Sequence, residues 1–170
     1  MFDLKGNICI LGDSIVYGAW DKEKHGYVNR LREDLKENKK VENIYGLGIP
    51  GETTAGLLKR LDTELKPRTP NTIIIGIGLN DTTYIKNKQR ETINIKEFIS
   101  NISKMIAIAN TYTNNILILG LTNVIEERTT PILWNDNEMY FNDTIKKYDI
   151  ALEVYCNTNK VKYLKLFDVL

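Results

Sequence analysis

Short apolar runs alternate along this chain with longer segments in which apolar residues recur at every third or fourth position. The runs are rich in β-branched residues and end at glycine or polar residues, which is typical of strands buried on both faces of a parallel sheet. We therefore predict five strands. They lie at residues 8–11, 41–47, 72–77, 116–121 and 161–167.

The segments between these runs predict amphipathic helices, because their apolar residues repeat with helical spacing. Helices are expected near Val28, from Thr53 or Thr54, from about Ile95 and from about Asp136. Strands that alternate with helices need right-handed crossovers between parallel strands. The pattern thus predicts an α/β fold, a three-layer α/β/α sandwich around a five-stranded parallel sheet with the flavodoxin-like strand order 2-1-3-4-5.

One connection, residues 122–135, is long for such a fold, and long connections often form lids or binding walls. We expect an irregular and mobile wall over the carboxyl edge of the sheet, with Trp134 approaching that edge. Both Trp134 and Tyr140 fit a position in the core as well as one in a substrate wall.

Length and charge limit the choice of partner. The chain of 170 residues is 42% hydrophobic, and we assign residues 1–170 to a single domain. Its 23 Lys and Arg balance 22 Asp and Glu, and a net charge of +1 favours neither nucleic acid nor an anionic membrane as a partner. A small, neutral or weakly charged molecule fits better, and the oligomeric state is left open.

Cellular location and metal binding follow from what the sequence lacks. Without a secretion-signal pattern at its start or an apolar run of membrane-spanning length, the chain is expected to be cytoplasmic. Cys9 and Cys156 have no paired spacing and are expected in the core, and His25 is the one histidine. We therefore predict no histidine-built metal site, although carboxylates could in principle supply a site of another kind.

Candidate chemistry gathers where predicted strands end. Ser14 follows the first strand, Gly51 the second and Asn80 the third, and the carboxyl ends of parallel strands share one edge. A hydroxyl, a glycine N–H and a side-chain amide are what acyl transfer needs, because such donors stabilise the developing oxyanion. Alternatively, Ser14 or Asp13 only caps the next helix.

The chain resembles the SGNH hydrolases, the GDSL family of esterases, lipases and thioesterases, along its whole length. Gly12-Asp13-Ser14-Ile15 matches the first block of that family, Gly51 the second and Asn80 in Gly78-Leu79-Asn80-Asp81 the third. The resemblance implies that Ser14 is the nucleophile of a serine esterase or acylhydrolase. Its oxyanion hole would comprise the Ser14 N–H, the Gly51 N–H and the Asn80 side chain, and its substrate a small acyl ester or thioester. This hydrolase function implies no cofactor.

The fourth element of the family, an Asp followed three residues later by His, is not present in the sequence. Asp168 and His25 do not have the places of that pair, so neither is assigned, and Glu52 and Asp81 are expected to support the site rather than react. We expect a domain that lacks the Asp-His segment and last helix, is weakly active or inactive, and exposes an apolar patch beside its first helix. No imidazole is expected within hydrogen-bonding reach of Ser14.

Two other functions remain open. A catalytically silent domain that binds a carbohydrate or an ester would have the same fold and would need no Asp-His pair. A flavodoxin-like or receiver-like binding module shares the fold. It should, however, carry a phosphate-binding loop or an acidic cluster after the first strand, where Gly12-Asp13-Ser14 offers a single acid.

Overall fold

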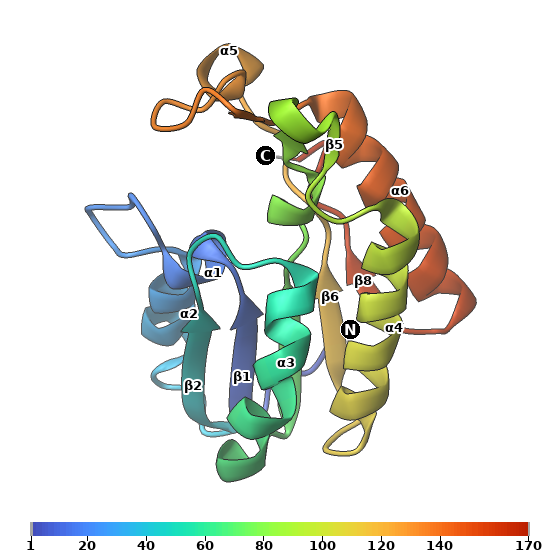
Figure 1. Cartoon of the computed structure of the whole chain (residues 1–170). Coiled ribbons are helices and arrows are strands. Elements are labelled where there is room, and N and C mark those ends of the chain that lie inside the picture. The colour runs from blue at the N-terminus through green and yellow to red at the C-terminus, as the bar shows by residue number, and fades with distance from the viewer. Residues whose placement is uncertain (1, 170) are drawn as a thin grey trace.

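A parallel sheet crosses the molecule in the order β2-β1-β3-β6-β8 (Figure 1). Since β6 and β8 are the fourth and fifth strands of this sheet along the chain, the order is the predicted 2-1-3-4-5. The computed structural model describes residues 2–169. The strands are β1 (Gly6–Gly12), β2 (Val41–Gly48), β3 (Thr72–Gly76), β6 (Ile116–Leu119) and β8 (Lys162–Leu164). Since β1 pairs with both β2 and β3, the ends of these strands are neighbours.

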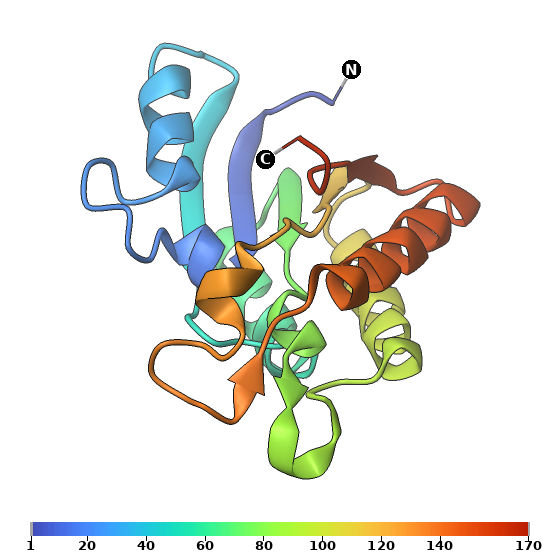
Figure 2. The same ribbon diagram turned by 90° about the horizontal axis from the view of Figure 1, so that it is seen from above.

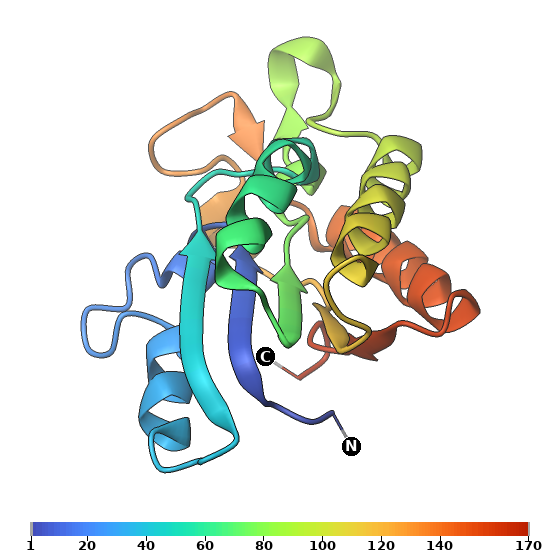
Figure 3. The ribbon, with the colours of Figure 1, turned by 90° about the horizontal axis from the view of Figure 1, so that it is seen from below.

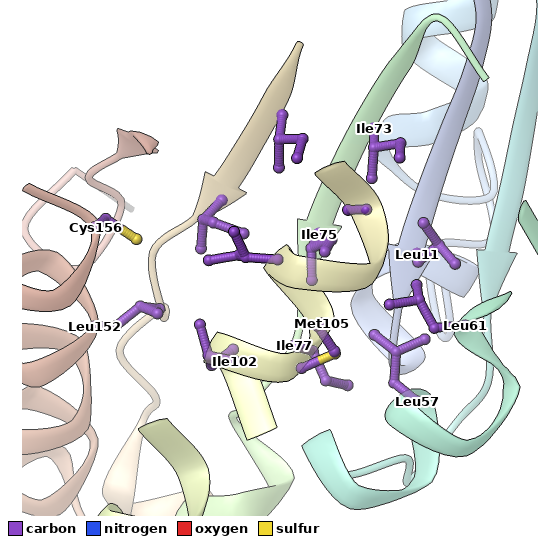
Figure 4. Packing of buried hydrophobic residues seen from close by; sticks show 14 of the residues in the cluster. Leu11, Leu57, Leu61, Ile73, Ile75, Ile77, Ile102, Met105, Leu152 and Cys156 are labelled. Carbon is purple, nitrogen blue, oxygen red and sulfur yellow. The ribbon is translucent and has the colours of Figure 1, made fainter. Parts of the chain in front are cut away.

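Helices α3 (Thr54–Leu65), α4 (Ile95–Asn110) and α6 (Asn142–Thr158) cover one face of the sheet (Figures 1 and 3). Their apolar stripes pack on residues of β1, β3 and β6 in the main core, as the labelled side chains show (Figure 4). Both cysteines are fully buried and unpaired, as the sequence predicted. Apolar side chains on both faces of β1 and β3 explain why these runs contain so few polar residues.

The other face is covered by α2 (Tyr27–Leu35), with Val28 packed on Ile8, Ile10 and Ile74. Beside α2 and the short α1 (Ser14–Tyr17) lies an apolar groove with a volume of about 280 Å³. Its wall includes Ile15, Val16, Leu119, Leu121, Leu164 and Leu166. The expectation of an apolar surface exposed beside the first helix is therefore met.

One predicted helix begins later than expected. Residues 136–141 are not helical; they include β7 (Glu138–Met139), and α6 starts at Asn142. A second, antiparallel sheet has the order β5-β4-β7 and joins β7 to β4 (Tyr84–Ile85) and β5 (Arg90–Glu91). Strands this short carry no detectable periodicity, so pattern analysis did not identify them.

Other short elements lie in predicted loops. They are α1, α5 (Glu126–Thr129), and the 3-10 turns η1 (Lys66–Arg68), η2 (Asn80–Thr82) and η3 (Lys86–Lys88).

Candidate active site

Ser14 is the first residue of α1, directly after β1. The turn is tight: a Cβ on Gly12 would lie 1.9 Å from the carbonyl oxygen of Gly76, so only glycine fits between the two strands. Asp13 caps α1, and its Oδ1 accepts a hydrogen bond of 2.9 Å from the Ile15 N–H. The first N–H groups of a helix have no acceptor within the helix, so the Ser14 N–H is free to serve a ligand. Ser14 is half-buried at this position.

Asp13 is a buried carboxyl, only 2% exposed. Burial raises the pKa of Asp13 to about 6, even though the Ile15 N–H stabilises its charged form. The helix-capping role that the sequence left open for Asp13 is thus real. Capping by Asp13 leaves the neighbouring Ser14 hydroxyl available for other chemistry.

Gly51 lies in the turn that follows β2. Its φ of +77° is a conformation that side chains disfavour, and nothing lies within 4 Å of the position a Cβ would take. The turn is tied to the end of β1, because the Ile49 N–H donates a hydrogen bond of 3.0 Å to the Gly12 carbonyl oxygen. This bond brings the turn of Gly51 next to the turn of Ser14.

Arg60 of α3 stabilises the turn that carries Gly51. Its guanidinium forms an ion pair of 2.5 Å with Glu52 and donates a hydrogen bond of 2.7 Å to the Leu47 carbonyl oxygen. The side chains of Arg60 and Glu52 are only 17% and 8% exposed. Glu52 therefore supports the turn, as expected.

Asn80 begins the turn η2 after β3. Its Nδ2 donates a hydrogen bond of 2.9 Å to the carbonyl oxygen of Glu52, the residue after Gly51. Its Oδ1 accepts a hydrogen bond of 2.8 Å from the Tyr140 hydroxyl. The structure thus links the three strand ends that carry Ser14, Gly51 and Asn80 through backbone and side-chain hydrogen bonds.

Asp81 lies behind Asn80 in a buried polar network. Its carboxylate accepts hydrogen bonds from the Thr54 N–H, at 2.9 Å, and from the Thr54 hydroxyl. The Asn101 amide donates to the same hydroxyl at 3.0 Å. Burial raises the pKa of Asp81 to about 6. Asp81 therefore anchors the start of α3 and supports the site from behind, as expected.

Within residues 2–169, the Ser14 hydroxyl forms no hydrogen bond with another side chain. His25 is exposed on the loop before α2, where it lines a separate cavity with Tyr17 and Arg32. Asp168 forms an ion pair of 3.1 Å with Lys165 instead of meeting an imidazole. The described part of the chain thus supplies no Asp-His pair beside Ser14.

The long connection lies over the carboxyl edge of the sheet, and Figure 2 looks down on that edge, with α5 and β7 above it. The Trp134 ring is 73% exposed, and its centroid lies 6.4 Å from that of Trp20, which is 85% exposed. Trp20 belongs to the loop that follows α1, and the Ala19 N–H in this loop donates a hydrogen bond of 2.9 Å to the Ser14 carbonyl oxygen. The Trp134 ring thus lies beside the loop that follows α1, and its approach to Ser14 itself stays a prediction.

Two contributors escaped sequence analysis. Tyr140 was predicted to lie either in the core or in a substrate wall, whereas its hydroxyl bonds to Asn80. Arg60 was not singled out in the sequence, although it pairs with Glu52. No periodic pattern signals this ion pair, because Glu52 lies in the turn before α3 and only Arg60 lies on the helix.

No cluster of three or more His, Cys, Asp or Glu side chains that could hold a metal ion occurs within residues 2–169. In the same range, every helix is too short or too polar to cross a membrane.

Comparison with known proteins agrees with this architecture. The profile of the GDSL-like lipase/acylhydrolase family matches residues 10–170. No curated protein sequence matches the chain.

Solved structures of similar fold share about a fifth of their residues with this chain. A lipase/acylhydrolase from Enterococcus faecalis is 20% identical with a TM-score of 0.76, over 97% of this chain and 77% of the other. TesA is 20% identical with a TM-score of 0.70, over 92% of this chain and 76% of the TesA chain. A psychrotrophic esterase, EstA from Pseudoalteromonas sp., inhibited by monoethylphosphonate, is 18% identical with a TM-score of 0.70, over 95% and 78%.

Proposed function

Because the chain belongs to the GDSL-like lipase/acylhydrolase family, a family of ester hydrolases, we propose that it cleaves a small acyl ester or thioester through an acyl-enzyme on Ser14. The observation that carries this proposal is the connection of three strand ends at one edge. Gly12 bonds to Ile49, and Asn80 bonds to Glu52 beside Gly51. A nucleophile and two donor-bearing turns are thereby held against one another.

In the proposed reaction, the Ser14 Oγ attacks the carbonyl carbon of the ester and loses its proton to a base. The bond to the leaving oxygen or sulfur then breaks while the protonated base returns the proton to it, which releases the alcohol or thiol. Water hydrolyses the acyl-serine in the second step. The Ser14 N–H, the Gly51 N–H and the Asn80 Nδ2 stabilise the oxyanion, and one such donor is worth about 3 kcal/mol of barrier. The proton acceptor is not assigned to any residue of the described chain.

The surroundings support an apolar acyl or alcohol group in the substrate. Trp20, Leu133 and Trp134 are 85%, 87% and 73% exposed and stand on the loops around the candidate site. These aromatic rings and the leucine side chain can make van der Waals contacts with an uncharged apolar group of a bound substrate. One of the similar solved structures is named a lipase/acylhydrolase, and this name also favours an apolar acyl group in the substrate.

A second function, that of a silent ligand-binding domain, is favoured by one observation. The Ser14 hydroxyl has no hydrogen-bonded base within residues 2–169. A serine without a base is a weak nucleophile, whereas the donors of the oxyanion hole could still bind an ester or a carboxylate.

Labelling with a fluorophosphonate separates the two functions, with p-nitrophenyl acetate hydrolysis measured in parallel. For the hydrolase, mass mapping should find the adduct on Ser14, and Ser14→Ala should abolish both labelling and turnover. Ser100→Ala is the matched control, because Ser100 is exposed on α4. Ester binding without adduct or turnover would establish the silent domain, and an adduct on another residue would reject Ser14.

A further inference from the structure

The Asn80 side chain has a defined orientation. The Glu52 carbonyl oxygen can only accept hydrogen bonds, so the atom that faces it at 2.9 Å must be the amide nitrogen. The Asn80 Oδ1 therefore faces the Tyr140 hydroxyl at 2.8 Å, and that hydroxyl is the donor. One N–H of the amide is used by Glu52, and the other remains for a ligand.

We propose that Tyr140 is a positioning residue that orients the Asn80 amide as an oxyanion donor, an inference that rests on the proposed function. An Asn amide held by Glu52 alone could still rotate about its last bond, which for Asn is a broad, roughly two-fold torsion. The bond from Tyr140 removes this freedom by fixing the oxygen as well as the nitrogen. Donation to Oδ1 also polarises the amide, which strengthens its remaining N–H as a donor.

Tyr140 is itself firmly held at the end of the long connection. Its N–H donates a hydrogen bond of 3.0 Å to the Thr129 carbonyl oxygen, and its own carbonyl oxygen accepts one of 2.8 Å from the Thr130 hydroxyl. Its phenol is half-buried, and burial raises its pKa. The hydroxyl therefore remains protonated near neutral pH and can donate to Asn80.

Tyr140→Phe tests the proposal, because it removes only the hydroxyl. With an aryl ester, kcat should fall about tenfold and KM should change less than about twofold, since only transition-state binding is lost. In an Asn80→Ala background, Tyr140→Phe should cause no further loss, because the two act as a unit. Tyr112→Phe is the control: it removes a comparable hydroxyl, bonded to Asp62 at 2.6 Å, at the far end of α3.

A second readout does not depend on turnover. The ¹⁵N side-chain amide signal of Asn80, assigned by its loss in Asn80→Ala, should shift in Tyr140→Phe because its oxygen loses a hydrogen bond. Its N–H should exchange with solvent about tenfold faster, because an amide no longer held at its oxygen opens its bond to Glu52 more often. An unchanged amide signal, or an equal loss of kcat with and without Asn80, would overturn the positioning role. A wild-type protein that hydrolyses no ester would contradict the proposed function alone, because the amide signal still reports on Tyr140.

Discussion

The Asn80 Nδ2 lies 2.9 Å from the Glu52 carbonyl oxygen, so the turn after β3 is bonded to the turn after β2. These residues are 28 positions apart in the chain. The bond places a side-chain amide beside the residue that follows Gly51, and the site is therefore a contact between turns rather than a property of one motif.

Replacing Asn80 by Ala should lower kcat on a short aryl ester about a hundredfold or more, because one donor to the oxyanion is lost. KM should change far less. Steady-state kinetics measures both, and thermal unfolding checks that the fold persists. Thr82→Ala is the control within the same turn, since it removes a bond of 2.7 Å to the Leu79 carbonyl oxygen and leaves the amide untouched. An unchanged kcat in Asn80→Ala would make Asn80 purely structural.

Replacing Arg60 by Met should destabilise the protein by about 3 kcal/mol, because the Glu52 charge is left buried without its partner. The turn that carries Gly51 should loosen as well, so ester turnover should fall together with stability. Urea denaturation measures the first effect. Arg30→Met breaks an ion pair with Asp21 whose Arg side chain is 45% exposed, and it should matter much less. Equal losses in both variants would argue against a supporting role for Arg60.

The free energy of unfolding should decrease as the pH rises from about 4 to about 6, in part because of Asp13. Burial raises the pKa of its carboxyl from 3.8 to about 6, so in this window the unfolded chain releases a proton that the folded protein retains. Asp13→Asn keeps an oxygen for the helix cap but cannot ionise. Its unfolding free energy should therefore fall by about 2 kcal/mol less than that of the wild type over this window.

Urea denaturation at pH 4, 5 and 6.5 measures this difference. Asp136→Asn, at an exposed position, serves as the control and should follow the wild type. Parallel pH profiles for Asp13→Asn and the wild type would show that Asp13 does not hold its proton in the folded state.

Replacing Trp134 by Ala should lower kcat/KM for a hexanoate ester about three- to tenfold relative to an acetate ester, because an aromatic contact with the longer chain is lost. Trp20→Ala should act in the same direction, since the two rings are neighbours. Ile150→Ala is the control, as this exposed residue lies on α6 away from the carboxyl edge. A chain-length preference that survives in both Trp variants would exclude the rings from the substrate wall.

The sequence by itself determined the sheet and the three strand ends of the site. Continuous apolar runs such as Ile73–Ile75 are stable only when covered on both faces, and this requirement predicts a parallel sheet with helices on each side. Ser14, Gly51 and Asn80 each follow such a run directly, so their placement at one edge follows from the strand order. Their roles in catalysis remain predictions.

Only the tertiary structure decided how the turns meet. Tyr140 reaches Asn80 across 60 positions, and the two-residue strands β4, β5 and β7 bring its segment there. Elements this short have no period to detect, and a single hydrogen bond between loops depends on backbone geometry that residue patterns do not encode. Apolar periodicity is repeated many times along a strand or helix, whereas a polar contact between distant turns occurs once. The first can be read locally, and the second exists only in the folded chain.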